Sequence, residues 1–263
     1  MSLDRETMSL RSSWTKEKRQ VSTRYEAEFE IAGPAAMFAR PDTGATPISY
    51  PVPTWSACKA MFESVTRGVL HEKREQGQRA EPAAFFCPTE VEIWRPIRYE
   101  KYVTNYRGPL RKPEQISEKK NTSFQLHATM LVDACFRIRG QCVRVPGAPD
   151  PSGNAPHALQ EIFLRRLAQQ KSKYAPCLGW KEFLPSYFGQ PRVHQELVDE
   201  SPRLQQDVDL GLPAFLLTTW DAPTNGRYAP IFRELEIRGG ILKFPRYEWV
   251  GDRFAFAADS HAA

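Results

Sequence analysis

The stretch 49–65 constrains the fold more than any other part of this chain of 263 residues. An apolar, proline-containing run ends at Thr54, and a helical pattern begins at once. Thr54 or Ser56 is a suitable N-cap, because its hydroxyl oxygen can accept a hydrogen bond from a free backbone N–H of the first turn. Lys59 and Glu63 lie one turn apart and can form an ion pair. One face of the predicted helix is apolar at helical spacing, with Cys58, Met61, Phe62 and Val65.

Strands are predicted on both sides of this helix. Residues 25–31 (YEAEFEI) and 89–94 (TEVEIW) alternate with a period of two, which is typical of a strand with one buried face. A β-rich segment, a helix and a return strand are predicted after them, at 124–142, 157–170 and 174–183. The order of these elements over 24–184 is βαββαβ, which predicts a ferredoxin-like (RRM-like) fold of the α+β class.

Composition divides the chain into three parts. Residues 1–22 are polar and charged, without the apolar segment of a secretory signal, and we expect them to form a flexible arm. Residues 23–184 hold the predicted RRM-like domain. Residues 185–263 are expected to form a smaller antiparallel sheet, with a hairpin around Gly239-Gly240 and a disordered tail. The sequence contains no apolar run long enough to cross a membrane.

Charge and cysteine content limit the classes of function. The net charge of +5 favours a polyanionic partner. The five cysteines lack CxxC spacing, so we expect reduced thiols in a cytoplasmic protein and neither disulfides nor a zinc knuckle. The five histidines lack metal-ligand spacing, so neither a metal nor another cofactor is expected. The sequence also lacks the motifs GxGxxG, GKS/GKT, HExxH and GxSxG.

His157 is the candidate catalytic residue. It follows a loop rich in proline and glycine, 147–154, and lies in the first turn of a predicted helix. An imidazole can take a proton from a ribose hydroxyl, or give one to a leaving 5′-oxygen, near neutral pH. The alternative is an exposed histidine at a helix start without a chemical role, and position alone leaves both interpretations open.

Aromatic and basic residues interleave over 99–107 (YEKYVTNYR), ahead of a basic loop at 108–121. Single-stranded RNA is bound in this way, because rings stack on bases and cations contact phosphates. The alternative is an amphipathic strand with aromatic core residues and a solvated basic face. With basic residues near the first helix included, the candidate RNA-binding residues are Arg40, Lys59, Arg67, Tyr102, Tyr106, Arg107 and Arg111.

In its ordered motifs the chain resembles the Cas5 proteins of type I-C CRISPR systems (Cas5d), within the RAMP superfamily. These motifs cover most of 24–245, although each one alone is weak. They are FEIAGPAAMFARPDTG, ISYPVPTWSACKAMFESV, VEIWRPI, His157 before a helix, CLGWKEF, VDLGLPAFL and RGGILKFP. The resemblance implies an RRM-like domain that carries a smaller C-terminal antiparallel sheet.

The resemblance also implies a function in guide-RNA production. Cas5d proteins cut precursor crRNA beside the repeat hairpin without a metal, and then hold the 5′ handle of the crRNA inside the Cascade complex. The implied partners are therefore the precursor and mature crRNA, Cas7 and Cas8 subunits, and duplex DNA through the complex. The reaction is attack by a ribose 2′-OH on its adjacent phosphate, which requires a general base, a general acid and a stabilising cation.

The catalytic set that the resemblance implies is only partly present. It consists of a tyrosine just after the first helix and a Lys-His pair before the second. His157 matches the histidine, but Pro156 stands at the lysine position and Thr66 at the tyrosine position. Either a nearby residue substitutes, with Arg67, His71 and Lys73 as candidates, or cleavage is weak or absent. The alternative functions are a non-catalytic crRNA-binding subunit of Cascade and a general RRM-like RNA-binding module.

Overall fold

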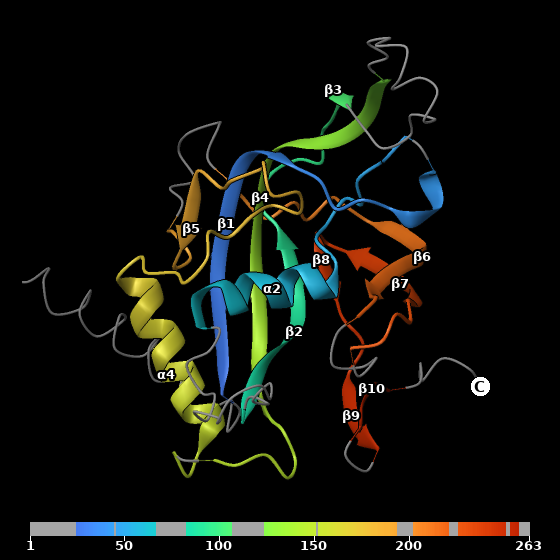
Figure 1. Ribbon diagram of the computed structural model, residues 1–263. Coiled ribbons are helices and arrows are strands. Elements are labelled where there is room, and N and C mark those ends of the chain that lie inside the picture. The colour runs from blue at the N-terminus through green and yellow to red at the C-terminus, as the bar shows by residue number, and fades with distance from the viewer. Residues whose placement is uncertain are drawn as a thin grey trace, which may run out of the picture.

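The computed structural model describes residues 25–44, 46–66, 83–106, 124–150, 152–193, 202–220, 226–250 and 253–257. Two α-helices lie against one face of a large antiparallel sheet, so the architecture mixes α and β structure (Figure 1). The predicted arm at 1–22, the whole basic loop at 108–121 and the end of the tail lie outside the described residues.

The sheet has eight strands, with the neighbour order β5-β1-β4-β2-β8-β7-β6 and β3 paired to β4. The helices α2 and α4 span Trp55–Thr66 and Ala155–Ala168, and a short 3-10 helix, η2, spans Pro41–Thr43. The strands of the first part are β1 (Glu26–Ala36), β2 (Ala84–Ile93), β3 (Tyr99–Tyr106), β4 (Phe124–Arg144) and β5 (Tyr187–Gly189). The strands of the second part are β6 (Leu210–Thr218), β7 (Ile231–Arg238), β8 (Ile241–Lys243), β9 (Tyr247–Val250) and β10 (Arg253–Phe256).

The long strand β4 organises the sheet. Its second half lies between β1 and β2, where Ile138 is opposite both Phe29 and Val91. Its first half pairs with β3, so that Tyr102 is opposite Ala128. The β3–β4 hairpin therefore extends from one end of the sheet, while the end of β4 leads into α4 at the other (Figure 1).

The predicted helix and its apolar face are confirmed. The Thr54 hydroxyl accepts a hydrogen bond from the Ala57 backbone N–H at 3.2 Å, as an N-cap does. The ring of Phe62 is fully buried and is stacked on Phe86 at 4.5 Å between ring centroids. It also makes an edge contact with Phe29 at 4.8 Å and lies 5.1 Å from Phe163 of α4. This aromatic cluster joins both helices to the sheet.

The predicted return strand at 174–183 is wrong. The strand that pairs with β1 on this side is β5, which begins at Tyr187. The segment before it turns over the end of β1, where the Met37 N–H donates to the Leu178 carbonyl at 2.9 Å. Gly179 has a φ of 91°, a left-handed conformation that no regular strand adopts.

The predicted separate C-terminal sheet is wrong for β6, β7 and β8. Val91 of β2 pairs with Leu242 of β8, so these three strands continue the main sheet. Leu242 is fully buried there, which explains the continuation. The separate two-stranded sheet contains β9 and β10. The hairpin around Gly239-Gly240 is confirmed, because Arg238 pairs with Ile241 and both glycines have positive φ.

Replacing Gly179 by alanine is expected to destabilise the protein more than the same change at Gly147. Both glycines have positive φ, where a non-glycine residue costs about 1–2 kcal/mol. A Cβ at Gly179 would also overlap the Met37 carbonyl, whereas nothing lies within 4 Å of one at Gly147. Urea denaturation of the two variants measures the difference. Equal free energies of unfolding would show that the contact with Met37 carries no cost.

Within the described part of the chain, neither helix has the length and apolarity that a membrane span requires.

Candidate active site

His157 is exposed in the first turn of α4, and the loop before the helix determines where that turn begins. The Asn154 side chain accepts a hydrogen bond from the His157 backbone N–H at 3.4 Å. Asp150 accepts one from the Ala155 backbone N–H at 2.9 Å. Pro156 is tolerated between them, because the first turn of a helix does not use its N–H groups within the helix. The backbone at His157 is therefore held in place, and its imidazole lies at the surface.

Tyr25, the residue before β1, lies beside His157. The two ring centroids are 5.5 Å apart in an edge-on arrangement. The Asn154 amide donates a hydrogen bond of 2.7 Å to the Tyr25 phenolic oxygen. The Cys142 backbone N–H donates to the Tyr25 carbonyl at 2.7 Å, which holds the tyrosine at the end of the β1–β4 pairing. A phenol and an imidazole thus face the same surface.

Arg144, the last residue of β4, places a cation at this end of the sheet. Its side chain is 59% exposed, and its Nη2 lies 3.9 Å from Asp150 Oδ2. Hydrogen bonds from the Ser152 hydroxyl and the Ala155 backbone N–H lower the pKa of Asp150, and the charge of Arg144 adds to this effect. Asp150 therefore stays ionised and pairs with the guanidinium. We call Tyr25, Arg144, Asn154 and His157 the His157 cluster.

Thr66 is not part of this cluster. Its side chain is buried, and its hydroxyl donates to the Phe62 carbonyl at 3.2 Å. Two residues earlier, the Ser64 carbonyl accepts from the Lys173 N–H at 2.7 Å, so this end of α2 lies against the segment that follows α4. The length of α4, about 20 Å, separates that segment from His157. The candidate substitutes Arg67, His71 and Lys73 lie outside the described residues.

Lys59 is corrected as an RNA-binding candidate. Its side chain is only 9% exposed, and its ammonium pairs with Glu63, as the one-turn spacing predicts. The same ammonium lies 5.5 Å from the centroid of the Phe85 ring. The lysine lies on the buried flank of α2, where phosphate would have to displace an ion pair and protein packing.

The other RNA-binding candidates lie at the β3–β4 end of the sheet or outside the described residues. Arg40 is exposed and forms a two-fold ion pair with Asp42 at 2.7 and 3.1 Å. Tyr102 is half-buried, with its ring centroid 5.8 Å from that of Phe183. Tyr106 ends β3, but its side chain is not among those described. The remaining three candidates, which lie outside the described ranges, are Arg67, Arg107 and Arg111.

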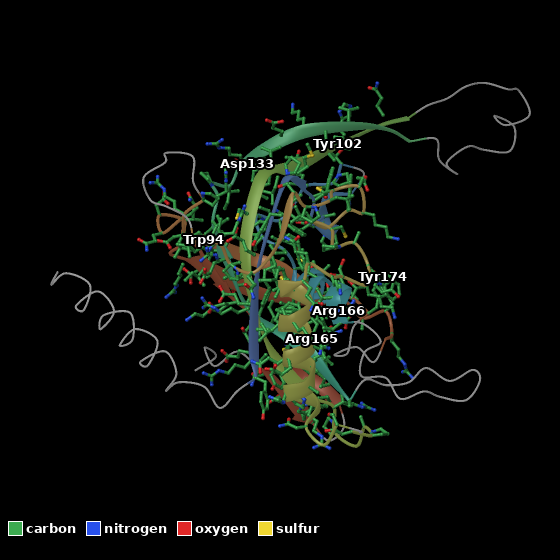
Figure 2. The ribbon with its side chains drawn as sticks, turned by 90° about the vertical axis from the view of Figure 1, so that its left-hand side faces the viewer. Trp94, Tyr102, Asp133, Arg165, Arg166 and Tyr174 are labelled. Carbon is green, nitrogen blue, oxygen red and sulfur yellow. The ribbon has the colours of Figure 1, made fainter. Side chains whose placement is uncertain are left out.

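These candidates lie far from His157. Tyr102 is paired with Ala128, and Arg144 is at the other end of β4. The two positions are up to about 50 Å apart along an extended strand. Figure 2 shows Tyr102 at one end of the sheet, with Arg165 and Arg166 on α4 well below it. The aromatic-basic strand and the His157 cluster therefore form two separate surfaces.

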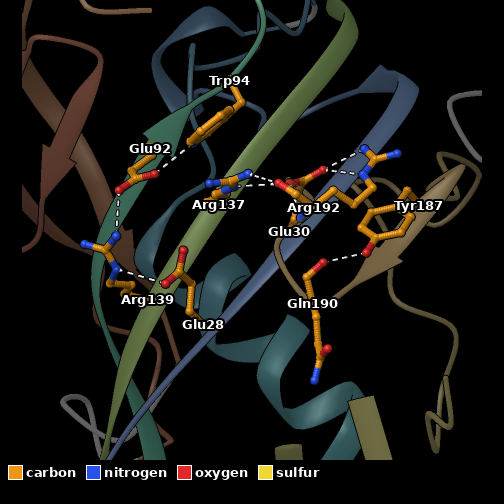
Figure 3. Close-up of polar contacts among 9 residues, drawn as sticks. All are labelled: Glu28, Glu30, Glu92, Trp94, Arg137, Arg139, Tyr187, Gln190 and Arg192. Carbon is orange, nitrogen blue, oxygen red and sulfur yellow. Dashed lines mark hydrogen bonds and ion pairs between the residues drawn. The ribbon is translucent and has the colours of Figure 1, made fainter. Parts of the chain in front are cut away.

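The helix-free face of the sheet carries a ladder of ion pairs (Figure 3). Arg139 of β4 donates to Glu28 of β1 at 3.2 Å and to Glu92 of β2 at 2.8 Å, and it also pairs with Glu90. The guanidinium of its neighbour Arg137 donates to the fully buried Glu30 at 3.1 Å. Arg192 donates to Glu30 from the opposite side at 2.7 Å. The charged positions of the alternating strands are therefore paired across the sheet.

Trp94 and Asp133 lie toward the helix-free side of the sheet in Figure 2. The Arg137 guanidinium carbon lies 3.4 Å from the Trp94 ring centroid, and the Trp94 indole N–H donates to Glu92 at 2.8 Å. RRM domains stack bases on aromatic side chains of the open sheet face. Here the arginine already covers this ring, and paired carboxylates surround it, so this face is a poor surface for RNA.

The described residues offer no group of metal ligands, and most of their cysteines are buried. Over these ranges, no three His, Cys, Asp or Glu side chains are grouped so that they could hold a metal ion. Four of the five cysteines are buried, as expected for core thiols. Burial raises the pKa of the Cys135 thiol to about 12, which keeps it protonated and unreactive.

Tyr25 and Arg144 are not among the residues that the sequence singles out as candidates. In the sequence, Tyr25 is only the first residue of an alternating strand, and Arg144 follows the predicted β segment. The register that pairs Glu26 with Gln141 brings both residues to the start of α4. The only signal in the sequence is that two strand ends and one helix start carry a phenol, a guanidinium and an imidazole.

Comparisons with known proteins agree with the resemblance. No family model matches the chain. A CRISPR pre-crRNA endoribonuclease Cas5d from Thermus thermophilus is 29% identical over 230 residues, which is 82% of this chain and 90% of that protein. A CRISPR pre-crRNA endoribonuclease Cas5d from Mannheimia succiniciproducens is 24% identical, over 82% of this chain and 93% of that protein.

Solved structures share the fold. A crystal structure of a CRISPR-associated protein has a TM-score of 0.57 at 17% identity, covering 86% of this chain and 95% of that chain. A functionally uncharacterized protein from Streptococcus mutans has a TM-score of 0.56 at 18% identity, covering 84% of this chain and 92% of that chain. The similarity to Cas5d proteins that the motifs indicate is thereby confirmed.

Proposed function

We propose that this Cas5d-like chain binds precursor crRNA and cuts it without a metal ion, with His157 as the general base. Two similar proteins over four-fifths of the chain are Cas5d pre-crRNA endoribonucleases, which supports RNA as the substrate. The observation that carries the catalytic assignment is the exposed His157 imidazole beside the Tyr25 phenol, at a helix start where Asp150 pairs with Arg144. His157 takes the proton of a ribose 2′-OH, which then attacks the adjacent phosphorus.

Arg144 supplies the stabilising cation in this proposal. The resemblance implies a lysine for that role at the position where this chain has Pro156. In-line attack on a phosphodiester places extra negative charge on the non-bridging oxygens, and a guanidinium can donate to two of them at once. The guanidinium is anchored beside Asp150 and is 59% exposed, so its donors can reach a bound phosphate. The cation thus comes from the end of β4 instead of the residue before the histidine.

The same proposal includes the fold type of the chain, the complex in which it acts and the residues that contact RNA. The strands β5-β1-β4-β2, with α2 and α4 on one face, form the ferredoxin-like unit. The chain acts in the cytoplasm in a type I-C Cascade, where it holds the crRNA 5′ handle and contacts Cas7 and Cas8 subunits, with duplex DNA reached through the complex. Arg40 and Tyr102, with Tyr106, Arg107, Arg111 and Arg67, contact RNA that extends from the cutting site along the sheet.

A second function is favoured by one specific observation. Thr66 is buried and Pro156 has no side-chain donor, so two positions of the catalytic set inferred from the resemblance cannot act. On that basis the chain would be a non-catalytic subunit that grips the crRNA. A general RRM-like module is disfavoured, because the helix-free sheet face is filled by paired charges.

Incubating the purified protein with its own labelled repeat RNA in EDTA separates these functions. The proposal predicts one cut beside the repeat hairpin and no cut in an unrelated hairpin of equal length. Gel-shift binding without a cut would overturn the enzymatic function and leave the binding subunit. Equal affinity for both hairpins would support the general module instead. Binding should weaken as salt rises, because phosphate contacts release counterions.

Replacing Arg144 by glutamine is expected to slow cleavage about 10-fold at saturating protein. The expected loss is smaller than that for a buried oxyanion-hole donor, because this guanidinium is largely exposed. Arg165→Gln is the matched control, since Arg165 is exposed in the last turn of α4, away from the cluster. Single-turnover rate constants in EDTA test both variants. A wild-type rate for Arg144→Gln would remove Arg144 from the site.

A further inference from the structure

We infer that Tyr25 is a catalytic residue of this RNA-cleavage site and gives its phenolic proton to the leaving 5′-oxygen. The inference rests on the proposed function and adds the general acid that His157 alone does not supply. The tyrosine expected after the first helix is Thr66, whose hydroxyl is buried and bonded within α2. A phenol supplied from the start of β1 occupies the His157 cluster instead.

The direction of one hydrogen bond supports this role. The Asn154 amide donates to the Tyr25 oxygen at 2.7 Å, so the oxygen acts as an acceptor there. Within the described ranges, the phenolic O–H has no acceptor, which leaves its proton for a ligand. The amide N–H also stabilises the negative charge that develops on the oxygen as the proton departs.

The geometry is held from both sides, so the two rings stay together. The Gln160 side chain of α4 donates to the Glu26 carbonyl at 2.6 Å, which ties the helix to the start of β1. Asn154 bonds to both residues, since its amide donates to the Tyr25 phenolic oxygen and its side-chain oxygen accepts from the His157 backbone N–H. The ring centroids lie 5.5 Å apart, so both side chains can reach one phosphodiester bound over them.

The proposed step balances without water. His157 removes the 2′-O–H proton as the bond between the 2′-oxygen and phosphorus forms. The bond between phosphorus and the 5′-oxygen breaks, and that oxygen takes the proton of Tyr25. The products are an RNA ending in a 2′,3′-cyclic phosphate and an RNA beginning with a 5′-OH. Proton exchange with solvent restores neutral His157 and protonated Tyr25.

An RNA with sulfur in place of the scissile 5′-oxygen tests the inference. A thiolate leaves without protonation far more readily than an alkoxide, so this RNA does not need the general acid. Tyr25→Phe keeps the ring but removes the phenolic proton. We expect this variant to cut ordinary RNA about 100-fold more slowly than wild type does, and to cut the thio-substituted RNA at the wild-type rate. Tyr174→Phe is the control, because Tyr174 is 52% exposed beyond the far end of α4; it should cut both RNAs normally.

Three outcomes are decisive. Equal losses on both RNAs would show that Tyr25→Phe damages the site without removing an acid, and no loss on either would exclude a role; both outcomes overturn the inference alone. A wild-type protein that cuts neither RNA would overturn the proposed function together with the inference. Gel shift and circular dichroism on each variant establish that binding and folding are intact.

Discussion

Replacing His157 by alanine is expected to slow RNA cleavage by about 100-fold or more, while RNA binding stays close to that of the wild type. A positioned general base typically contributes 10²- to 10⁴-fold to a rate, or roughly 3–5 kcal/mol of transition-state stabilisation. The imidazole is exposed. The capping contact with Asn154 is made by the backbone N–H of residue 157, which the alanine variant retains. The change therefore removes the chemistry and spares the helix start.

His127 supplies the matched control for this prediction. It is also exposed, but it lies in the first half of β4, opposite Val103 of β3, at the other end of the sheet. His127→Ala is expected to change affinity at most, with a normal rate constant at saturating protein. Single-turnover cleavage in EDTA measures both variants. If the two alanine variants cut equally fast, His157 is not the base.

Replacing Phe62 by alanine is expected to lower the free energy of unfolding by about 4 kcal/mol. Truncating a buried phenylalanine typically costs 3–5 kcal/mol, through lost apolar transfer and the cavity left behind. Phe62 is fully buried, and its ring contacts three phenylalanines, Phe29, Phe86 and Phe163. A Cβ at Gly140 would lie 2.7 Å from the Phe62 ring, so the sheet is shaped to receive it.

Urea denaturation followed by circular dichroism measures this loss. Phe232→Ala is the control, because Phe232 on β7 is 40% exposed and its truncation should cost roughly 1 kcal/mol or less. Since Phe62 joins α2 and α4 to the sheet, the variant should also cut RNA poorly at temperatures near its unfolding midpoint. A loss below about 2 kcal/mol would mean that the cluster repacks around the cavity.

Local patterns predicted the first helix and the Gly239-Gly240 hairpin well. The spacing from Cys58 to Val65 is a direct consequence of helical geometry, and the structure buries that face. Gly239 and Gly240 have the positive φ that a two-residue hairpin turn needs, and few other residues adopt it. These features depend on neighbours within a few residues, so the sequence contains the information directly.

The predictions that failed depend on contacts between distant segments. The charge pattern of 174–183 gives no sign that Gly179 must lie against the Met37 backbone, which rules out a strand. The continuation of the main sheet depends on the edge of β2 pairing with β8 about 150 residues later, as at Val91 and Leu242. The residue pattern of β2 does not indicate that its edge is open, or that β8 is the strand that pairs with it.

The candidate site was predictable only in part for the same reason. The position of His157 at a helix start follows from local sequence, and the structure agrees. Tyr25, which contacts it, and Arg144 come to this end of the sheet only through the β1–β4 register, which spans more than a hundred residues. Lys59 is included as an RNA-binding candidate because a lysine on the flank of an amphipathic helix is usually exposed. The packing of its side chain against Phe85 depends on a distant strand, so the local pattern does not reveal it.

The most direct test of the central claim uses repeat RNA with one 2′-deoxy nucleotide at the cut position. If His157 activates a 2′-OH, the wild-type protein in EDTA cuts the all-ribose RNA to a 2′,3′-cyclic phosphate end. It binds the 2′-deoxy RNA equally well and leaves it intact. Cleavage of the 2′-deoxy RNA at the same position, or no cleavage of the all-ribose RNA, would contradict the account.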